Sequence, residues 1–178
     1  MAVIVETKRL ILREIELTDE QGMFALDSDN DVHKYLKEPI VHNIEEIREK
    51  IKRVQKQYIT TGVGRWAVIE KLTNEFLGWT GIKLEDQKIY HPIRYYDIGY
   101  RLIQKFWGKG YATEAAKASL DYGFEHLNIS DVYADVFSNN FVSKKVLEKI
   151  GLEYVKTFDN NGLTIDWYKI QNPNGLKR

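Results

Sequence analysis

The sequence is most informative at Trp107-Gly108-Lys109-Gly110-Tyr111-Ala112. This stretch joins a strand-like run, residues 96–103, to a strongly helical one, residues 112–127. Small residues at alternate positions let backbone N–H groups point outward, and the first helical turn adds unsatisfied donors and the positive end of the helix dipole. Several convergent N–H donors suit a ligand with several oxygens, so the stretch predicts a pyrophosphate site. The alternative is a glycine-rich helix entry with no ligand.

Two better-known phosphate motifs do not match this stretch. A P-loop requires glycine at position 103, where Ile103 stands, and Ser or Thr at position 110, where Gly110 stands. The dinucleotide fingerprint requires a third glycine at the position of Thr113 and a strand–helix–strand unit near the start of the chain. The spacing therefore argues against a phosphate-loop nucleotide hydrolase.

The composition is that of an ordinary globular protein, with 43% hydrophobic and 29% charged residues. We expect a single domain over residues 1–178, because a chain of this length buries most of its apolar surface without staples. The 26 basic and 26 acidic residues cancel, which argues against a broad nucleic-acid or membrane-binding surface. The chain has no cysteine, no apolar run near the ~18 residues of a membrane span, and no signal-peptide pattern. We expect a cytoplasmic protein.

Strand and helix patterns alternate along the chain. Strands are expected at residues 9–14, 65–70, 76–84, 95–103, 132–136, 152–158 and 163–170, and helices from residue 18 and at 31–36, 43–58, 112–127 and 140–149. Thr18 and Gln21 have the spacing of a capping box, and residues 159–162 predict a hairpin turn. The tail from Gln171 to Arg178 is expected to be loose. This order predicts an α+β fold with a mixed sheet.

Three segments, in the right order, resemble the GNAT-type N-acetyltransferases, in the branch that includes the RimJ/RimL ribosomal-protein N-acetyltransferases. They are residues 6–13 with 17–19, residues 97–100 with 107–115, and residues 140–143 leading to 148–152. The resemblance covers nearly the whole chain. It implies a GNAT-like acyl-CoA N-acyltransferase fold, whose mixed, mostly antiparallel sheet has helices on both faces. It also implies direct transfer of an acetyl group from acetyl-CoA to a primary amine in a ternary complex.

The resemblance also implies where acetyl-CoA binds. Backbone N–H groups hold the pyrophosphate, and the pantetheine arm pairs with the backbone where a splay from residues 132–136 leaves groups open. The residues expected to contact acetyl-CoA are Leu102, Ile103, Trp107, Gly108, Lys109, Gly110, Tyr111, Ala112 and Asn140. Trp107 either packs beneath the loop or touches the co-substrate. Asn140 is expected to hydrogen-bond the pantetheine, with a plain helix N-cap as the alternative.

The reaction requires a base, because an alkyl ammonium at neutral pH must lose a proton before it attacks. Asp97 is our first candidate, since it lies on the strand beside the thioester. Its alternative role is an ion pair with Arg94 or Arg101. Asp159, near the last hairpin, is the second candidate.

The reaction also releases a thiolate. Many GNAT proteins carry a tyrosine four residues after the position of Ser143, as the acid that protonates this thiolate, but here the residue is Leu147. Leucine cannot donate a proton. The acid is therefore another group, or the thiolate leaves unprotonated, and Ser143 and solvent are the available substitutes. The alternative role for Ser143 is a hydrogen bond to its own backbone.

The sequence does not identify the amine that accepts the acetyl group. Protein N-termini (ribosomal or otherwise), polyamines and other small amines all fit, and the family makes a homodimer or homotrimer plausible. A catalytically silent CoA-binding sensor is the competing hypothesis, supported by Leu147. The four histidines, His33, His42, His91 and His126, lack metal-site spacing, so we expect no metal and surface positions for them.

Overall fold

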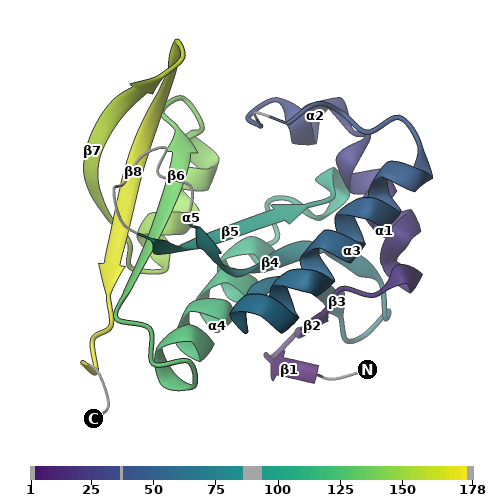
Figure 1. The fold of residues 1–178 in the computed structure, drawn as a ribbon, viewed down its shortest axis with the longest axis horizontal. Coiled ribbons are helices and arrows are strands. Elements are labelled where there is room, and N and C mark those ends of the chain that lie inside the picture. The colour runs from purple at the N-terminus through teal and green to yellow at the C-terminus, as the bar shows by residue number, and fades with distance from the viewer. Residues whose placement is uncertain (1–2, 37, 86–93, 176–178) are drawn as a thin grey trace.

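The computed structural model describes residues 3–36, 38–85 and 94–175 (Figure 1). The strands are β1 Val3–Glu6, β2 Leu10–Glu14, β3 Gly64–Glu70, β4 Phe76–Glu85, β5 Tyr95–Leu102, β6 Asp131–Phe137, β7 Glu153–Asn160 and β8 Leu163–Gln171. The helices are α1 Glu20–Asp27, α2 Asn30–His33, α3 Ile44–Thr61, α4 Tyr111–Glu125 and α5 Phe141–Lys149, with short 3-10 turns η1 Leu17–Asp19 and η2 Gln104–Phe106.

The strands form one sheet in the order β1-β2-β3-β4-β5-β6-β8-β7. Neighbouring strands are antiparallel except β5 and β6, which are parallel. The α+β fold with a mixed, mostly antiparallel sheet is therefore confirmed. Helices α1 and α3 cover one face, and α4 and α5 cover the other (Figure 1).

The parallel pair β5–β6 separates soon after it starts. Only Tyr96 with Val132 and Asp97 with Tyr133 are in register. Beyond these residues β5 stays paired with β4 and β6 stays paired with β8. In Figure 1, β5 runs across the molecule while β6 turns away from it. The predicted splay is confirmed, and we call this opening the V.

Apolar spacing explains how the helices cover the sheet. Ile47 and Ile51, one helical turn apart on α3, are both fully buried beneath that helix. On the other face, α4 presents small residues to the sheet. A Cβ at Gly123 would lie 2.4 Å from Ile82, so glycine lets α4 approach β4 closely. None of the helices in the described ranges is both long enough and apolar enough to cross a membrane.

The start of the first helix differs from the prediction. Thr18 and Gln21 do not form a capping box. Instead, Asp19 in η1 accepts the backbone N–H of Glu16 at 2.8 Å and pairs with both Nη atoms of Arg13, at 2.6 and 2.7 Å. The charge of buried Arg13 needs a partner, so Asp19 is drawn inward and α1 begins only at Glu20.

Three further expectations are corrected. The helix predicted at 31–36 begins one residue earlier, at Asn30 after the Asp29 cap, but it is shorter because it already ends at His33. His33 is buried rather than on the surface, and its Nε2 has no hydrogen-bond partner among the described residues. The beginning of the tail is held in place and is not loose, because the buried Asn172 side chain donates hydrogen bonds to the carbonyls of Phe124 and Ile129. His91 lies outside the described residues.

Candidate active site

The predicted pyrophosphate loop has the geometry of an anion site. Gly108 and Gly110 have φ of 73° and 80°, the left-handed region that glycine tolerates best. The first hydrogen bond into α4 runs from the N–H of Glu114 to the carbonyl of Gly110, at 3.1 Å. Among the described residues, none accepts the backbone N–H groups of positions 108–113. Six consecutive donors at a helix N-terminus are therefore open to a ligand.

Arg9 holds this loop from the side of β2. Its Nη1 donates to the carbonyl of Lys109 at 2.9 Å, and its Nε donates to Glu114 at 2.6 Å. Burial by itself raises the pKa of Glu114, but hydrogen bonds from Thr7 and Arg9 outweigh it and hold the pKa below its ordinary value. Glu114 is thus ionised but neutralised by Arg9, and it does not compete with an anion at the helix end.

Trp107 both packs against the chain and faces solvent. Its indole N–H donates to the carbonyl of Leu102 at 2.7 Å, while 47% of its surface stays exposed. This hydrogen bond joins the loop to the end of β5. It also takes one of the backbone groups that was predicted to pair with pantetheine.

The backbone groups that remain open follow from the β-sheet pattern. The N–H of Ile103 donates to Leu77 beside β4, and the carbonyl of Ile103 accepts from Phe106, so Ile103 is not open. Successive residues of a strand point their backbone groups to alternate sides, so those of Tyr100 and Leu102 point away from β4 into the V, where the Leu102 carbonyl already accepts from Trp107. The predicted pairing with pantetheine is therefore limited to the open edge of β5 at Tyr100 and Leu102, and Ile103 cannot take part in it.

Asp97 lies at the base of the V, where the pairing of β5 with β6 ends. Its buried carboxylate forms an ion pair with Arg65 on β3, not with Arg94 or Arg101. A second Arg65 nitrogen donates to the Asp97 carbonyl at 2.9 Å. Among the described residues the other carboxylate oxygen of Asp97, Oδ1, has no hydrogen-bond partner. Burial raises the pKa of Asp97 above its ordinary value, and the charge of Arg65 opposes this.

Glycines let Arg65 reach that carboxylate. Arg65 is opposite Gly81 in the sheet, and its guanidinium crosses Gly99. A Cβ on Gly99 would lie 2.8 Å from Arg65 Nη2. This partner could not be predicted from the sequence, because residues 65 and 97 become neighbours only through β4, which lies between their strands.

Ser143 is held by two other polar residues. Asn140 caps α5, as its side-chain oxygen accepts the Ser143 N–H at 3.1 Å. The Ser143 hydroxyl lies 2.8 Å from the hydroxyl of Tyr100, which also donates to the Ser143 carbonyl at 2.8 Å. Leu147 is buried in the core and offers no donor. Tyr100 was missed, since no local sequence pattern connects β5 with α5.

The second candidate base, Asp159, is exposed on β7. Its carboxylate accepts the N–H of Gly162 at 3.0 Å and thereby closes the β7–β8 turn. The geometry of Asp159 is thus that of a turn residue, whereas Asp97 is buried at the base of the V.

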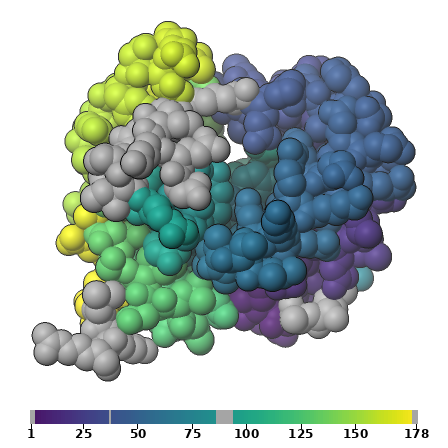
Figure 2. Space-filling view, in the orientation of Figure 1, coloured from purple at the N-terminus to yellow at the C-terminus, as the bar shows by residue number. Residues whose placement is uncertain are grey.

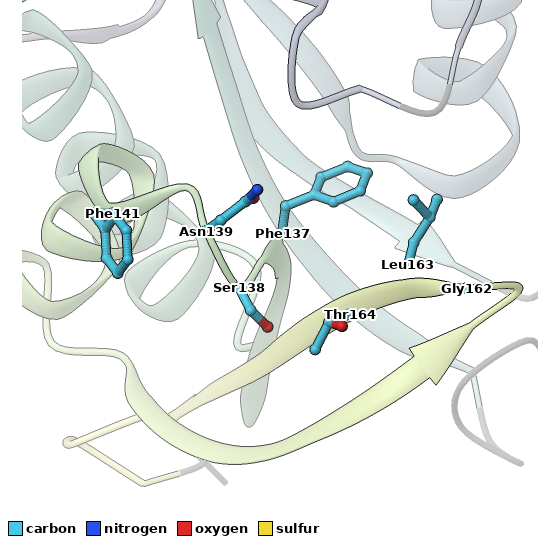
Figure 3. Close-up of a pocket in the computed structure, with 7 residues that line it drawn as sticks. All are labelled: Phe137, Ser138, Asn139, Phe141, Gly162, Leu163 and Thr164. Carbon is cyan, nitrogen blue, oxygen red and sulfur yellow. The ribbon is translucent and has the colours of Figure 1, made fainter.

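A hollow separates the N-terminal helices, blue in Figure 2, from the yellow-green C-terminal hairpin. Beside it, a pocket of about 460 Å³ lies between the β6–α5 loop and the hairpin (Figure 3). It is lined by Phe137, Ser138, Asn139, Phe141, Gly162, Leu163 and Thr164. The ring of Tyr35, from the segment after α2, lies 6.5 Å from the ring of Phe137. Aromatic rings from both parts of the molecule therefore meet at this side of the hollow.

Comparison with known proteins agrees with this geometry. Residues 9–153 match the family model described as an acetyltransferase (GNAT) domain. The chain is 32% identical over 163 residues to an uncharacterised N-acetyltransferase, p20, of Bacillus licheniformis, a match that covers 92% of this chain and 86% of the relative. A GNAT-family acetyltransferase from Bacillus anthracis is 28% identical with a TM-score of 0.78, over 94% of this chain and 98% of that one.

Two more distant structures show the same fold. The ribosomal L7/L12 α-N-protein acetyltransferase RimL, solved with coenzyme A, has a TM-score of 0.80 at 17% identity, covering 96% of this chain and 98% of RimL. A spermidine N-acetyltransferase from Vibrio cholerae, solved with CoA and spermine, has a TM-score of 0.74 at 21% identity, covering 93% and 97%. With an open donor loop, a splayed parallel pair and a family match over most of its length, this chain belongs to the GNAT family and is an acyl-CoA-dependent acetyltransferase.

Proposed function

We propose that this enzyme acetylates a single primary amine, on a protein N-terminus or a small molecule, by direct attack on acetyl-CoA in a ternary complex. The observation that carries the proposal is the V, with open N–H donors beside it at residues 108–112 and a buried carboxylate at its base. The RimJ/RimL-like branch is part of this proposal. It is supported by the fold shared with RimL, which acetylates a protein N-terminus.

The co-substrate has a defined path in this proposal. The open N–H groups of the loop bind the pyrophosphate, with Asn140 and the edge of β5 along the pantetheine. A backbone N–H at this edge polarises the thioester carbonyl. One such donor is worth ~3–4 kcal/mol of barrier in enzymes where it has been removed.

Asp97 takes the proton of the acceptor ammonium, directly or through water. Its free Oδ1 accepts, and its pKa is raised by burial, which makes the carboxylate a better base than an exposed one. The neutral amine then attacks the thioester carbon. The C–N bond forms, the C–S bond breaks with its electron pair leaving on sulfur, and the nitrogen gives up its second proton to solvent as the amide forms.

The charges near the acceptor side favour an amine with one positive charge. Three cations and three carboxylates are paired there: Arg65 with Asp97, Arg101 and Lys50 with Asp27, and Lys50 with Glu38. Among these described groups no negative charge is in excess. Within this set a polyamine, which carries several positive charges, would find no excess of carboxylates with which to pair.

The test is release of CoA, measured by thiol detection, with three acceptors. They are a peptide with a free N-terminus, the same peptide with its N-terminus acetylated, and spermidine. We expect release with the free peptide, none with the blocked peptide, and a lower kcat/KM with spermidine. Calorimetric binding of acetyl-CoA without CoA release from any amine would instead describe a sensor. A higher kcat/KM for spermidine would overturn the preference for a single charge.

A further inference from the structure

The hydroxyl groups of Tyr100 and Ser143 form a pair that bridges the V. Tyr100 extends from β5, and Ser143 lies in the first turn of α5, which directly follows β6. We propose that Tyr100 is a positioning residue, whose hydroxyl orients the Ser143 hydroxyl so that Ser143 donates a hydrogen bond to the departing sulfur of acetyl-CoA. This inference rests on the proposed function, because it places the thioester in the V.

The two oxygens can share their protons in two ways. In the first, Tyr100 donates to the Ser143 carbonyl and Ser143 donates to Tyr100, which is consistent with both 2.8 Å distances. In the second, Tyr100 donates to the Ser143 hydroxyl oxygen, and the Ser143 proton becomes free for another acceptor. The heavy atoms stay in place, because only hydroxyl rotation separates the two forms. The pair can therefore supply a donor when negative charge appears on sulfur.

This arrangement fills the role left open by Leu147. As the C–S bond breaks, sulfur takes the electron pair as a thiolate, whose ordinary thiol pKa of about 8.5 makes it a stable leaving group at neutral pH. It then needs a hydrogen bond more than a transferred proton. Ser143 supplies that bond, Tyr100 supplies the compensating bond to Ser143, and no proton leaves the pair.

Tyr100 is suited to act as a permanent donor. Burial raises the pKa of its phenol well above the ordinary value, although the hydrogen bond to Ser143 opposes this. Among the described residues, the other titratable group that acts on it is the phenol of Tyr168 on β8, which also disfavours ionisation of Tyr100. Tyr100 therefore stays protonated through neutral and mildly alkaline pH.

Kinetics of a double-mutant cycle test the proposal. Tyr100→Phe and Ser143→Ala are each expected to lower kcat about tenfold, since each removes a hydrogen bond to a charged or charge-oriented group, while KM for acetyl-CoA changes less. The double variant should be no slower than Ser143→Ala alone, because Tyr100 acts through Ser143. Ser143→Thr, which keeps a hydroxyl, should recover part of kcat.

Tyr96→Phe is the matched control. Tyr96 lies on the same face of β5, packs against the same core, and has no hydrogen bond to its hydroxyl among the described residues. It should leave kcat unchanged. If Tyr100→Phe lowers the melting temperature but not kcat, or if its effect adds fully to that of Ser143→Ala, then Tyr100 is only a structural link and the inference fails.

The thiol pKa of bound CoA gives a second, independent readout in the binary complex. A donor to sulfur stabilises the thiolate, so this pKa should be lower in the wild type than in Ser143→Ala or Tyr100→Phe, by about one unit for a tenfold effect. It is followed by the ultraviolet absorbance of the thiolate during a pH titration. This wild-type comparison with Ser143→Ala stands even if Tyr100→Phe does not fold. Equal pKa values in the wild type and Ser143→Ala would overturn the inference.

Failure of the inference and failure of the proposed function are distinguishable. If acetyl-CoA does not bind, or no amine releases CoA, the proposed function fails. If binding and turnover are normal, but neither kcat nor the thiol pKa depends on the two hydroxyls, only the role of Tyr100 and Ser143 fails.

Discussion

At the scale of single residues, the site depends on buried polar groups that have few partners. Asp97 shares its carboxylate with Arg65 through one oxygen and keeps the other available. Burying an ion pair such as Asp97–Arg65 costs desolvation free energy, so a contribution to stability does not by itself explain why residue 97 is charged. The proposed role as a proton acceptor would give this charge a function.

Asp97→Asn should lower kcat/KM by about a hundredfold, the lower range for a general base, because the amide cannot accept the proton. In the wild type, activity should fall as pH decreases through the pKa of Asp97. Since burial raises that pKa, the fall should begin at a higher pH than for an ordinary aspartate. The variant should lose this limb of the kcat/KM profile.

Asp121→Asn serves as the control, since Asp121 on α4 is also paired with a cation, Lys117, but on the surface. Its pH profile should match the wild type. Because Asp97→Asn leaves Arg65 without its partner, melting curves are needed to confirm that the variant is folded at the assay temperature. A folded variant with an unchanged profile would remove Asp97 from the reaction.

At the scale of elements, the loop before α4 combines two glycines in the left-handed region with a row of open donors. Gly108→Ala should raise KM for acetyl-CoA about tenfold, because a shifted loop weakens a hydrogen bond to a charged phosphate. Steady-state kinetics at saturating acceptor measure this.

The matched control for that substitution is Gly62→Ala, at the end of α3. The two glycines have φ of 73° and 72°, and an added Cβ meets nothing within 4 Å at either. Both variants should therefore lose a similar amount of stability, about 1–2 kcal/mol of backbone strain. Only the loop variant should change KM. An equal KM in both would mean that the loop does not bind the co-substrate.

Helix α5 contributes a second prediction at this scale. Leu147 is 2% exposed and packs in the core that α4, β6 and α5 share. Leu147→Tyr should reduce the free energy of unfolding by about 1–3 kcal/mol through overpacking, without raising kcat. Chemical denaturation and turnover measure the two effects. An increase in kcat would show that a tyrosine at this position reaches the thiolate, and that the Tyr100–Ser143 pair is not the donor.

At the scale of the whole molecule, one buried carboxylate, that of Asp166, joins helix α5 to strands β6, β7 and β8. Asp166 on β8 accepts hydrogen bonds from Ser138 after β6, Lys144 on α5 and Thr157 on β7, at 2.6 to 2.7 Å. It thus holds α5, with Ser143 and Asn140, against the strands on the far side of the V. Burial alone raises the pKa of Asp166, but these donors outweigh it and hold the pKa below its ordinary value.

Asp166→Asn should lower the free energy of unfolding by about 1–3 kcal/mol at neutral pH, because Lys144 loses its charged partner. A carboxylate whose pKa is lower in the folded state stabilises the protein above its unfolded pKa of about 3.9, and this stabilisation is lost as pH falls through the folded pKa. The difference between wild type and variant should therefore shrink below about pH 4. Urea unfolding at pH 7 and in acid measures it, and a constant difference would contradict the role of the charge.

Local patterns predicted most elements to within a few residues. The helix predicted to begin at residue 43 does begin there, with Asn43 as its N-cap, and the turn predicted at residues 159–162 is also found, because a cap or turn depends on side chains within a few positions. β1 was missed, since its four residues carry no pattern beyond a short apolar run. The start of α1 was misplaced because Arg13 attracts Asp19 from outside the local window.

By itself, the sequence determined the class of fold, the donor loop and the family, because each of these is encoded by residues that are close together along the chain. The tertiary structure alone decided the partners: Arg65 for Asp97, Tyr100 for Ser143 and Arg9 for the loop. These pairs join residues between 32 and 100 positions apart. They exist only because strand pairing and helix packing bring them within hydrogen-bond distance, and no local preference of the chain specifies such contacts.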